Sequence, residues 1–274
     1  MIVSTSLHFS GVISQEMLNL VERIPALERK VEALSISAAI VDKVFVYNED
    51  AVTRTSNRPF KENLLTAYNI RPRHTANGLL LIRCMLTGAW LPCATVIASH
   101  IVKHMWNEYR LHETLGMEVD DVGNGLLLFK PIEWALDNSK ICFVYDEGFR
   151  TFNMRILDPL LNDKTLLSVL EHPPSNSLRK FASDLSNDVW NALVDNIGSL
   201  TFGGFKDRWL DFEGMSHQRP FKRALCFHAR RARAYALQQQ WIAAGDVTFD
   251  DFWSEGDYKI KVTDWLATLD AAVN

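Results

Sequence analysis

Hydrophobic and polar positions follow two different periods along this 274-residue chain, and the change between them predicts its elements. Between positions 14 and 34, apolar residues recur every three or four positions, which indicates a helix with one apolar face. Short β-branched and aromatic runs then indicate strands, first at 43–47 and again between 78 and 158. The pattern returns to a helical period after Pro159. We therefore expect an α+β protein.

Three further helices follow from the same pattern and from capping residues. One is predicted from Lys61 to Asn69, and a second spans 160–170. A third runs from its cap Ser177 to about Asn196, after the polar stretch at 172–177. These segments suggest a helical region with one strand at 1–77, a core at 78–158, and a helical region at 159–274.

The first apolar stripe has two interpretations, and the sequence leaves both open. Its members are Met17, Leu20, Ile24, Leu27, Val31 and Leu34. The stripe is either one face of a helical hairpin packed on the domain or a seam that joins two copies of the chain. Two to three heptads are short for a coiled coil, so the packed helix is favoured and the homodimer is the alternative.

Composition indicates a globular protein inside the cell. Hydrophobic residues make up 47% of the chain and charged residues 23%, which is typical of soluble domains. The start of the chain lacks a basic region followed by a long apolar run, so no signal peptide is expected. No run is long and apolar enough for a membrane helix. We expect the cytoplasm or nucleus, with all four cysteines reduced.

Charge is distributed unevenly, and this bears on the partner. The net charge of −4 argues against a protein that coats nucleic acid through bulk charge. Residues 214–245, however, contain no acid, and residues 246–274 are strongly acidic. The basic segment is either a solvated helix face or a surface that follows phosphates. Its cations are Arg219, Lys222, Arg223, Arg230, Arg231 and Arg233.

Candidate chemistry is concentrated between positions 83 and 158. The stretch reads RCMLTG at 83–88, VIASHIVKHMW at 96–106 and NGLLLFKPIEWALDNSKICFVYD at 124–146. An apolar strand thus ends in Ser99-His100, Asn124-Gly125 forms a turn before a second strand, and a short helix presents Glu133 and Asp137. Strand, exposed histidine, second strand and acidic helix are the order of a small metal-dependent catalytic unit.

This stretch resembles the HNH endonucleases, the ββα-metal nucleases, in the subgroup that combines C-x-x-TG with [A/S]-H-I and NG-x-x-L. The resemblance implies that His100 is the general base and that Asn124 braces the unit. It places Glu133 as a metal ligand on the helix, with Asp137 and Ser99 as further candidate ligands. It also implies a divalent cation and cleavage of phosphodiester bonds in nucleic acid, most simply DNA.

Three positions depart from the family pattern. Ser99 stands where an acidic or imidazole ligand often precedes the histidine, and Lys103 replaces a usual proline. Glu133 replaces the usual helix histidine. Carboxylate oxygen suits Mg²⁺ or Mn²⁺ better than imidazole does. Because Glu133 and Asp137 are four residues apart, they share a helix face and could turn toward one cation.

The sequence therefore predicts a metal-dependent endonuclease built on an HNH-like ββα core, within a mostly helical chain. Nucleic acid is expected to contact Lys103, Arg223, Arg230, Arg231 and Arg233. The alternative is a scaffold that has lost catalysis and serves as a nucleic-acid-binding or protein-interaction module.

Overall fold

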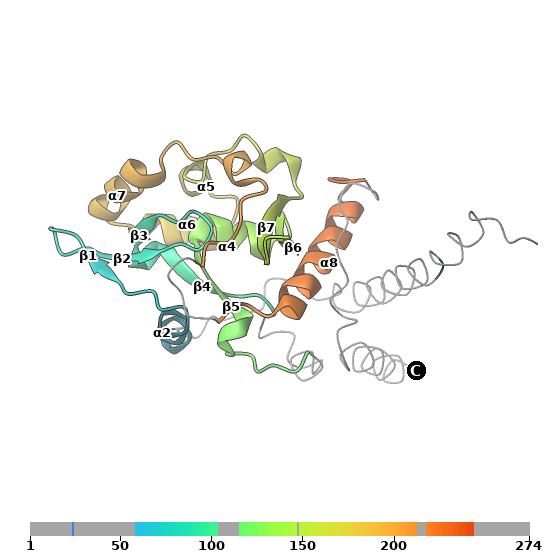
Figure 1. The fold of residues 1–274 in the computed structure, drawn as a ribbon. Coiled ribbons are helices and arrows are strands. Elements are labelled where there is room, and N and C mark those ends of the chain that lie inside the picture. The colour runs from blue at the N-terminus through green and yellow to red at the C-terminus, as the bar shows by residue number, and fades with distance from the viewer. Residues whose placement is uncertain (1–23, 25–57, 104–114, 147, 213–217, 244–274) are drawn as a thin grey trace, which may run out of the picture.

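A computed structural model of the chain describes residues 24, 58–103, 115–146, 148–212 and 218–243 (Figure 1). The apolar stripe at 17–34, apart from Ile24, lies outside the described residues, as does the strand predicted at 43–47. The acidic segment 246–274 lies outside them as well. The homodimer predicted through the stripe therefore stays a prediction.

The described residues form an α+β structure with six α-helices and three small antiparallel sheets. The strands are β1 (Arg73–His74), β2 (Leu80–Arg83), β3 (Trp90–Pro92), β4 (Val96–His100), β5 (Gly125–Phe129), β6 (Ile141–Asp146) and β7 (Thr151–Ile156). The α-helices are α2 (Arg58–Ala67), α4 (Lys130–Asp137), α5 (Ser168–Glu171), α6 (Asn176–Ser183), α7 (Asn187–Ile197) and α8 (Lys222–Gln238). Short 3₁₀ turns are η1 (Cys93–Thr95), η3 (Val122–Asn124), η4 (Pro159–Leu161) and η5 (Gly203–Phe205).

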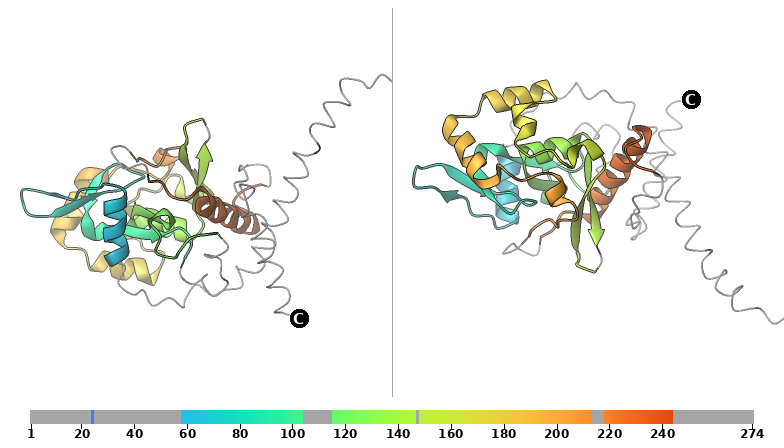
Figure 2. Two further views of the ribbon diagram at one scale, coloured as in Figure 1. Left: turned by 60° about the horizontal axis from the view of Figure 1, so that its bottom comes forward. Right: turned by 90° about the horizontal axis from the view of Figure 1, so that it is seen from above.

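The centre of the fold is the pair β4–β5 followed directly by α4. The two strands are antiparallel, with His100 opposite Gly125 and Val96 opposite Phe129. All five residues of β5 are buried, so this strand reads as a continuous apolar run rather than an alternating one. In the views of Figures 1 and 2, α2 and α4 lie on opposite sides of this pair. Strand, strand and helix thus occur in the order that the sequence predicted.

Helix α2 packs closely on the pair because Gly125 has no side chain. A Cβ atom at Gly125 would lie 2.6 Å from the side chains of Leu64 and Phe60, closer than real contacts allow. The Tyr68 hydroxyl, just beyond α2, donates to the carbonyls of Val122 and Gly125. The glycine of the Asn-Gly motif is therefore needed for helix packing.

The C-x-x-T-G motif forms a turn beside the outer edge of β5. Gly88 has a positive φ of 70°, and its N–H donates to the Cys84 carbonyl. The Cys84 sulfur accepts from the Phe129 N–H at 3.3 Å, and the Met85 N–H donates to Leu127. These contacts satisfy backbone groups of β5 that no neighbouring strand pairs. The motif is structural.

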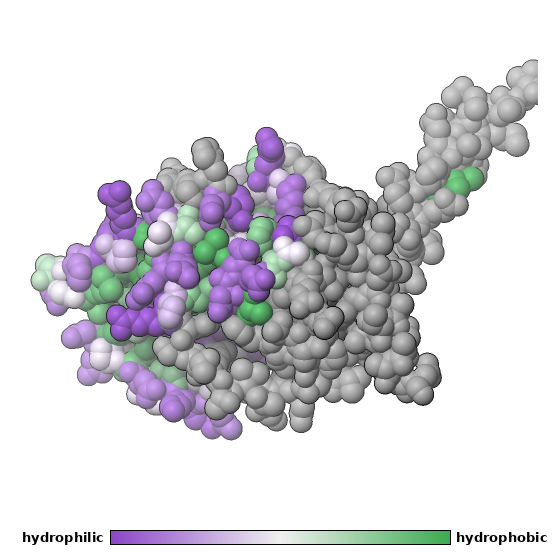
Figure 3. All heavy atoms as spheres, turned by 90° about the horizontal axis from the view of Figure 1, so that it is seen from below, coloured by the Kyte–Doolittle hydropathy of each residue, from purple (hydrophilic) through white to green (hydrophobic). Residues whose placement is uncertain are grey.

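The larger of two apolar clusters runs from Phe60 on α2 to Phe227 on α8, and a smaller one joins Cys142 of β6 to Ala229 of α8. Helix α8 packs on β6, and its buried residues include Ala224, Leu225 and Ala229. The face seen in Figure 3 mixes hydrophilic residues with smaller hydrophobic areas. All four cysteines are free thiols, as expected. No helix within the described ranges is long and apolar enough to span a bilayer.

Two predicted helices were wrong, for different reasons. The segment 160–170 is not one helix, because Thr165 bridges Thr201 and the Leu166 N–H donates to Leu200, which holds the chain extended between η4 and α5. The segment 177–196 is two helices, because Ser186 caps a new one by accepting from the Val189 N–H. Helix α2 confirms the prediction at 61–69 within a few residues.

The buried His228 on α8 should make the fold sensitive to acid. It is 2% exposed, its Nε2 faces the Leu136 carbonyl at 3.0 Å, and burial lowers its pKa to about 3. The unfolded chain takes up this proton near pH 6.5, so stability is full above that pH and falls as the pH drops toward 3.

Replacing His228 with Gln, which keeps an N–H donor, should remove this loss. Between pH 7 and pH 5, urea unfolding should show wild type losing about 2 kcal/mol more than H228Q. Equal losses in the two proteins would mean that His228 does not carry the acid sensitivity.

Candidate functional site

His100 ends β4 and has two defined neighbours. Its ring stacks on Phe60 of α2, with centroids 3.9 Å apart and planes 5° from parallel. Its Nε2 lies 2.9 Å from Asp120 Oδ1. The His100 side chain is only 8% exposed, whereas that of Asp120 is 61% exposed. The Asp120 carboxylate therefore bonds the Nε2 edge of the His100 ring, and stacking on Phe60 fixes the plane of that ring.

Asn124 closes the connection between the two strands. Its side chain is fully buried, and Oδ1 accepts from the Val102 N–H at 2.8 Å. Its Nδ2 donates to the carbonyls of Val102 and Val119 at 2.9 and 2.8 Å. One amide thus ties the chain just after His100 to the chain just before η3. This geometry is what a bracing residue requires.

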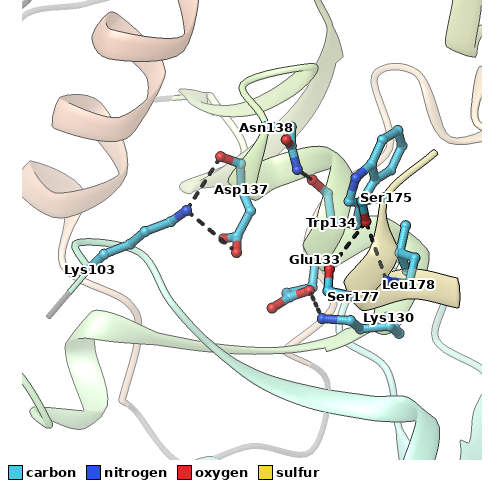
Figure 4. Close-up of polar contacts among 9 residues, drawn as sticks. All are labelled: Lys103, Lys130, Glu133, Trp134, Asp137, Asn138, Ser175, Ser177 and Leu178. Carbon is cyan, nitrogen blue, oxygen red and sulfur yellow. Dashed lines mark hydrogen bonds and ion pairs between the residues drawn. The ribbon is translucent and has the colours of Figure 1, made fainter. Parts of the chain in front are cut away.

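Glu133 lies on α4, on the other side of the strand pair from α2, and is paired with a lysine. Lys130 Nζ is 2.6 Å from Glu133 Oε2, and both side chains are 5% exposed (Figure 4). The spacing of three residues brings both onto one helix face. The pair is a buried ion pair at the first turn of α4.

Asp137 and Ser99 complete the predicted ligand set. Lys103 Nζ lies 3.5 Å from both the carboxylate and the backbone oxygen of Asp137 (Figure 4). Ser99 is buried, and its Oγ has no hydrogen-bond partner. Since side chains alternate along a strand, Ser99 faces away from the α2 side on which His100 lies. The structure thus groups Ser99 with the α4 side of the pair and His100 with the α2 side.

Helix α4 carries the type of oxygen ligand that a hard divalent cation prefers but, among the residues that the structure describes, not a converging set of them. Mg²⁺ is usually held by one or two carboxylates together with waters and substrate phosphates. Glu133 and Asp137 supply such oxygens, and the Ser99 hydroxyl is a buried oxygen without a partner. Over the described ranges, however, no three His, Cys, Asp or Glu side chains converge. Both carboxylates also already face a lysine.

The predicted nucleic-acid contacts differ widely in exposure. Arg223 Nη2 donates to the Gly116 carbonyl at 2.9 Å, and its Nε donates to Leu115. Arg231 is only 8% exposed. Arg230 and Arg233 are half-buried, and burial lowers the pKa of the Arg233 guanidinium. The six cations of the basic segment therefore do not form one solvated stripe.

Asp120, Phe60 and Lys130 were missed by sequence reasoning. Phe60 and Asp120 lie 40 and 20 positions from His100, and no spacing rule connects residues so far apart. Lys130 could have been found, because a lysine three residues before a glutamate on one helix is a readable pair.

A comparison with known families bears directly on this unit. Residues 84–144 match the family model described as HNH endonuclease, so the chain contains an HNH endonuclease domain there. The matched residues span β4, β5 and α4 and include His100, Asn124 and Glu133. No curated protein and no solved structure matches the chain. The resemblance found in the sequence is confirmed for this segment.

Asn124 should be among the most costly side chains to remove. N124A leaves three backbone partners without the amide, two of them buried and one half-buried, so we expect about 3 kcal/mol of lost unfolding free energy in urea. Asn196 on α7 is the matched control, because its amide makes one exposed bond to Ala192. N196A should stay within about 0.5 kcal/mol of wild type. A similar small loss for N124A would remove the bracing role.

Proposed function

We propose that this protein is a metal-dependent endonuclease that hydrolyses phosphodiester bonds in DNA, with His100 as the general base. The observation that carries the proposal is the placement of His100 within the HNH domain, at the end of β4, between Phe60 and Asp120. A base must keep one nitrogen fixed and the other available to take a proton.

Asp120 defines which nitrogen acts. Because its carboxylate accepts from Nε2–H, the neutral ring carries its lone pair on Nδ1. In the proposed step Nδ1 takes a proton from the attacking water, and Asp120 compensates the positive charge that develops on the ring. Phe60 keeps the ring plane fixed throughout. Asp120 and Phe60 are positioning residues, and His100 is the catalytic one.

The proposed cofactor is Mg²⁺ or Mn²⁺, which would be held through the Glu133 and Asp137 carboxylates, with Ser99 as a further candidate ligand. Such a cation, when bound, stabilises the negative charge on the scissile phosphate and on the leaving oxygen. The oxygen-only donor set supports this choice over a softer ion. Asn124 contributes by fixing the backbone at Val102, two residues after His100.

DNA is the proposed partner, and contact is proposed through local basic side chains. The net charge of −4 gives no bulk attraction to a polyanion. Lys103 lies beside Asp137 at the end of α4, close to where the proposed cation and a phosphate would meet. Arg230 and Arg233 are proposed as the main phosphate contacts, because Arg231 is buried and the Arg223 guanidinium already donates to the Leu115 and Gly116 carbonyls. An intracellular location is part of the same proposal.

A second candidate is an HNH scaffold that binds nucleic acid or protein without cleaving. Two observations favour it. His100 stacks on α2 at one side of the strand pair, whereas Glu133 lies on α4 at the other side, so the proposed base and the proposed ligand do not face each other. The ammonium of Lys130 also already balances the Glu133 carboxylate. A stable pair of this kind would leave Glu133 without a ligand role. Cleavage assays separate the two candidates directly.

Plasmid nicking is the first test. Purified protein should nick plasmid DNA with Mg²⁺ or Mn²⁺, lose activity in EDTA and gain little from Zn²⁺. H100A should fold normally and cut about a hundredfold to ten-thousandfold more slowly, the range for losing a general base. D120N should show a smaller loss, of the order of 10- to 100-fold. H172A, which changes an exposed histidine elsewhere, is the control and should keep full activity.

Two results would reject the nuclease. One is wild-type protein that nicks nothing with any of these ions, which would favour the binding scaffold. The other is H100A with wild-type activity, which would leave cleavage without its proposed base.

The basic residues are tested by salt dependence. For R230Q/R233Q, a plot of log K for DNA against log salt concentration should be less steep, by roughly one unit per lost phosphate contact. K103Q should show the same kind of change. R179Q on α6 removes an exposed arginine elsewhere and should leave the slope unchanged. An unchanged slope in R230Q/R233Q would assign these arginines to the packing of α8.

A further inference from the structure

We infer that the exposed edge of the β1–β2–β3 sheet is a second surface that binds the DNA backbone, apart from the catalytic unit. This surface consists of Arg71, Arg73, His74 and Trp90 and is called the β1 patch. The inference rests on the proposed function, because the partner is the proposed substrate. Three of the four residues lie outside the segment that matches the HNH endonuclease model, so the family pattern does not assign them.

The chain around β1 has a local excess of positive charge. Residues 63–103 contain no Asp or Glu. Arg71, Arg73 and His74 are exposed, and no carboxylate of the described residues pairs with any of them. Exposed cations without neighbouring acids attract a polyanion locally, even in a chain whose net charge is −4. The partner that this charge fits is a phosphate backbone.

Arg73 is oriented by an aromatic ring before any partner binds. Its Cζ atom lies 3.8 Å from the centroid of the Trp90 ring on β3, a close cation–π contact. Trp90 is half-buried and packs against the core, so the ring is a fixed platform. The planar guanidinium can donate two parallel bonds to one phosphate. Because Trp90 already holds the guanidinium, less side-chain freedom is lost on binding.

Arg83, the other arginine of this sheet, is engaged within the fold. It lies on β2 directly opposite Trp90 in the strand ladder. Its guanidinium donates to the carboxylate of Asp211, which balances its charge. Arg83 therefore joins two distant segments of the chain, and the β1 patch is confined to the edge strand.

The β1 patch is separate from the proposed base. The β1–β2–β3 sheet does not include the β4–β5 pair, at whose end His100 lies. In Figures 1 and 2 the β1–β2 hairpin projects from the molecule on the side away from α8. Contacts to phosphates position a protein on the duplex without reading its sequence. We therefore expect the patch to change binding and to leave the cleavage step unchanged.

Binding of duplex DNA in EDTA, followed by fluorescence anisotropy, tests the inference without cleavage. R71Q/R73Q should make the plot of log K against log salt concentration less steep by about two units, roughly one per lost phosphate contact. Between about 50 and 200 mM salt, wild type should therefore lose about tenfold more affinity than the variant. R179Q/K180Q, which removes two exposed cations from α6, is the matched control and should keep the wild-type slope.

Two positions separate the guanidinium fork and the ring from the charge. R73K keeps the charge, so the salt slope should stay, but affinity should fall about threefold because an ammonium lacks the planar fork. W90L removes the ring beneath Arg73 and should weaken binding about threefold. W90F keeps an aromatic face and should bind nearly as wild type does, which a purely structural role of the indole would not predict.

The outcomes that contradict the inference are distinct. An unchanged salt slope in R71Q/R73Q would overturn it, and so would an equal change in R179Q/K180Q. Polyglutamate serves as a second probe, because it carries charge without phosphates. If R71Q/R73Q loses affinity for polyglutamate but not for DNA, the patch belongs to an acidic protein segment and the inference is wrong.

Failure of the proposed function gives a different result. In the nicking assay R71Q/R73Q should raise KM and leave kcat within about twofold of wild type, because the lost contacts contribute to binding alone. Wild-type protein that binds duplex DNA through the β1 patch but never nicks it rejects the nuclease and leaves the inference standing.

Discussion

The buried amide of Asn124 is the contact on which the geometry of this unit depends. It bonds Val102 on one side of the connection and Val119 on the other, and so joins the segments that leave β4 and enter η3. His100 lies two residues before Val102. The Asn124 bonds therefore fix the backbone close to the His100 ring. The neighbouring Gly125 lets α2 approach, and α2 brings Phe60 to the ring. Asparagine and glycine thus have separate roles within one motif.

Charge balance is the second constraint on the site. The two carboxylates of α4 each face a lysine, but the pairs differ in length and in exposure to water. A buried ion pair gives up a partner only at high cost, whereas an exposed one does so readily. Two carboxylates, each facing a lysine, therefore lead to different expectations for Glu133 and Asp137.

Helices outside the matched HNH segment pack directly on it. Helix α2 covers the side of the strand pair that bears His100, while α8 packs beyond β6. The core is continuous from α2 to α8. Residues outside the matched segment therefore set the environment of the proposed base, and Phe60 is the clearest case. The family pattern alone does not include it.

Sequence by itself determined the order of strand, strand and helix, the position of α2, and the motif residues, because these depend on local periodicity and fixed spacing. It failed at 160–170, where pairing of Thr165 with Thr201 outweighs helical propensity. Only the tertiary structure decided that Asp120 and Phe60 hold His100, since both are distant in the chain. The spacing of Lys130 and Glu133 was readable, but their burial was not, because burial depends on what the rest of the chain packs over them.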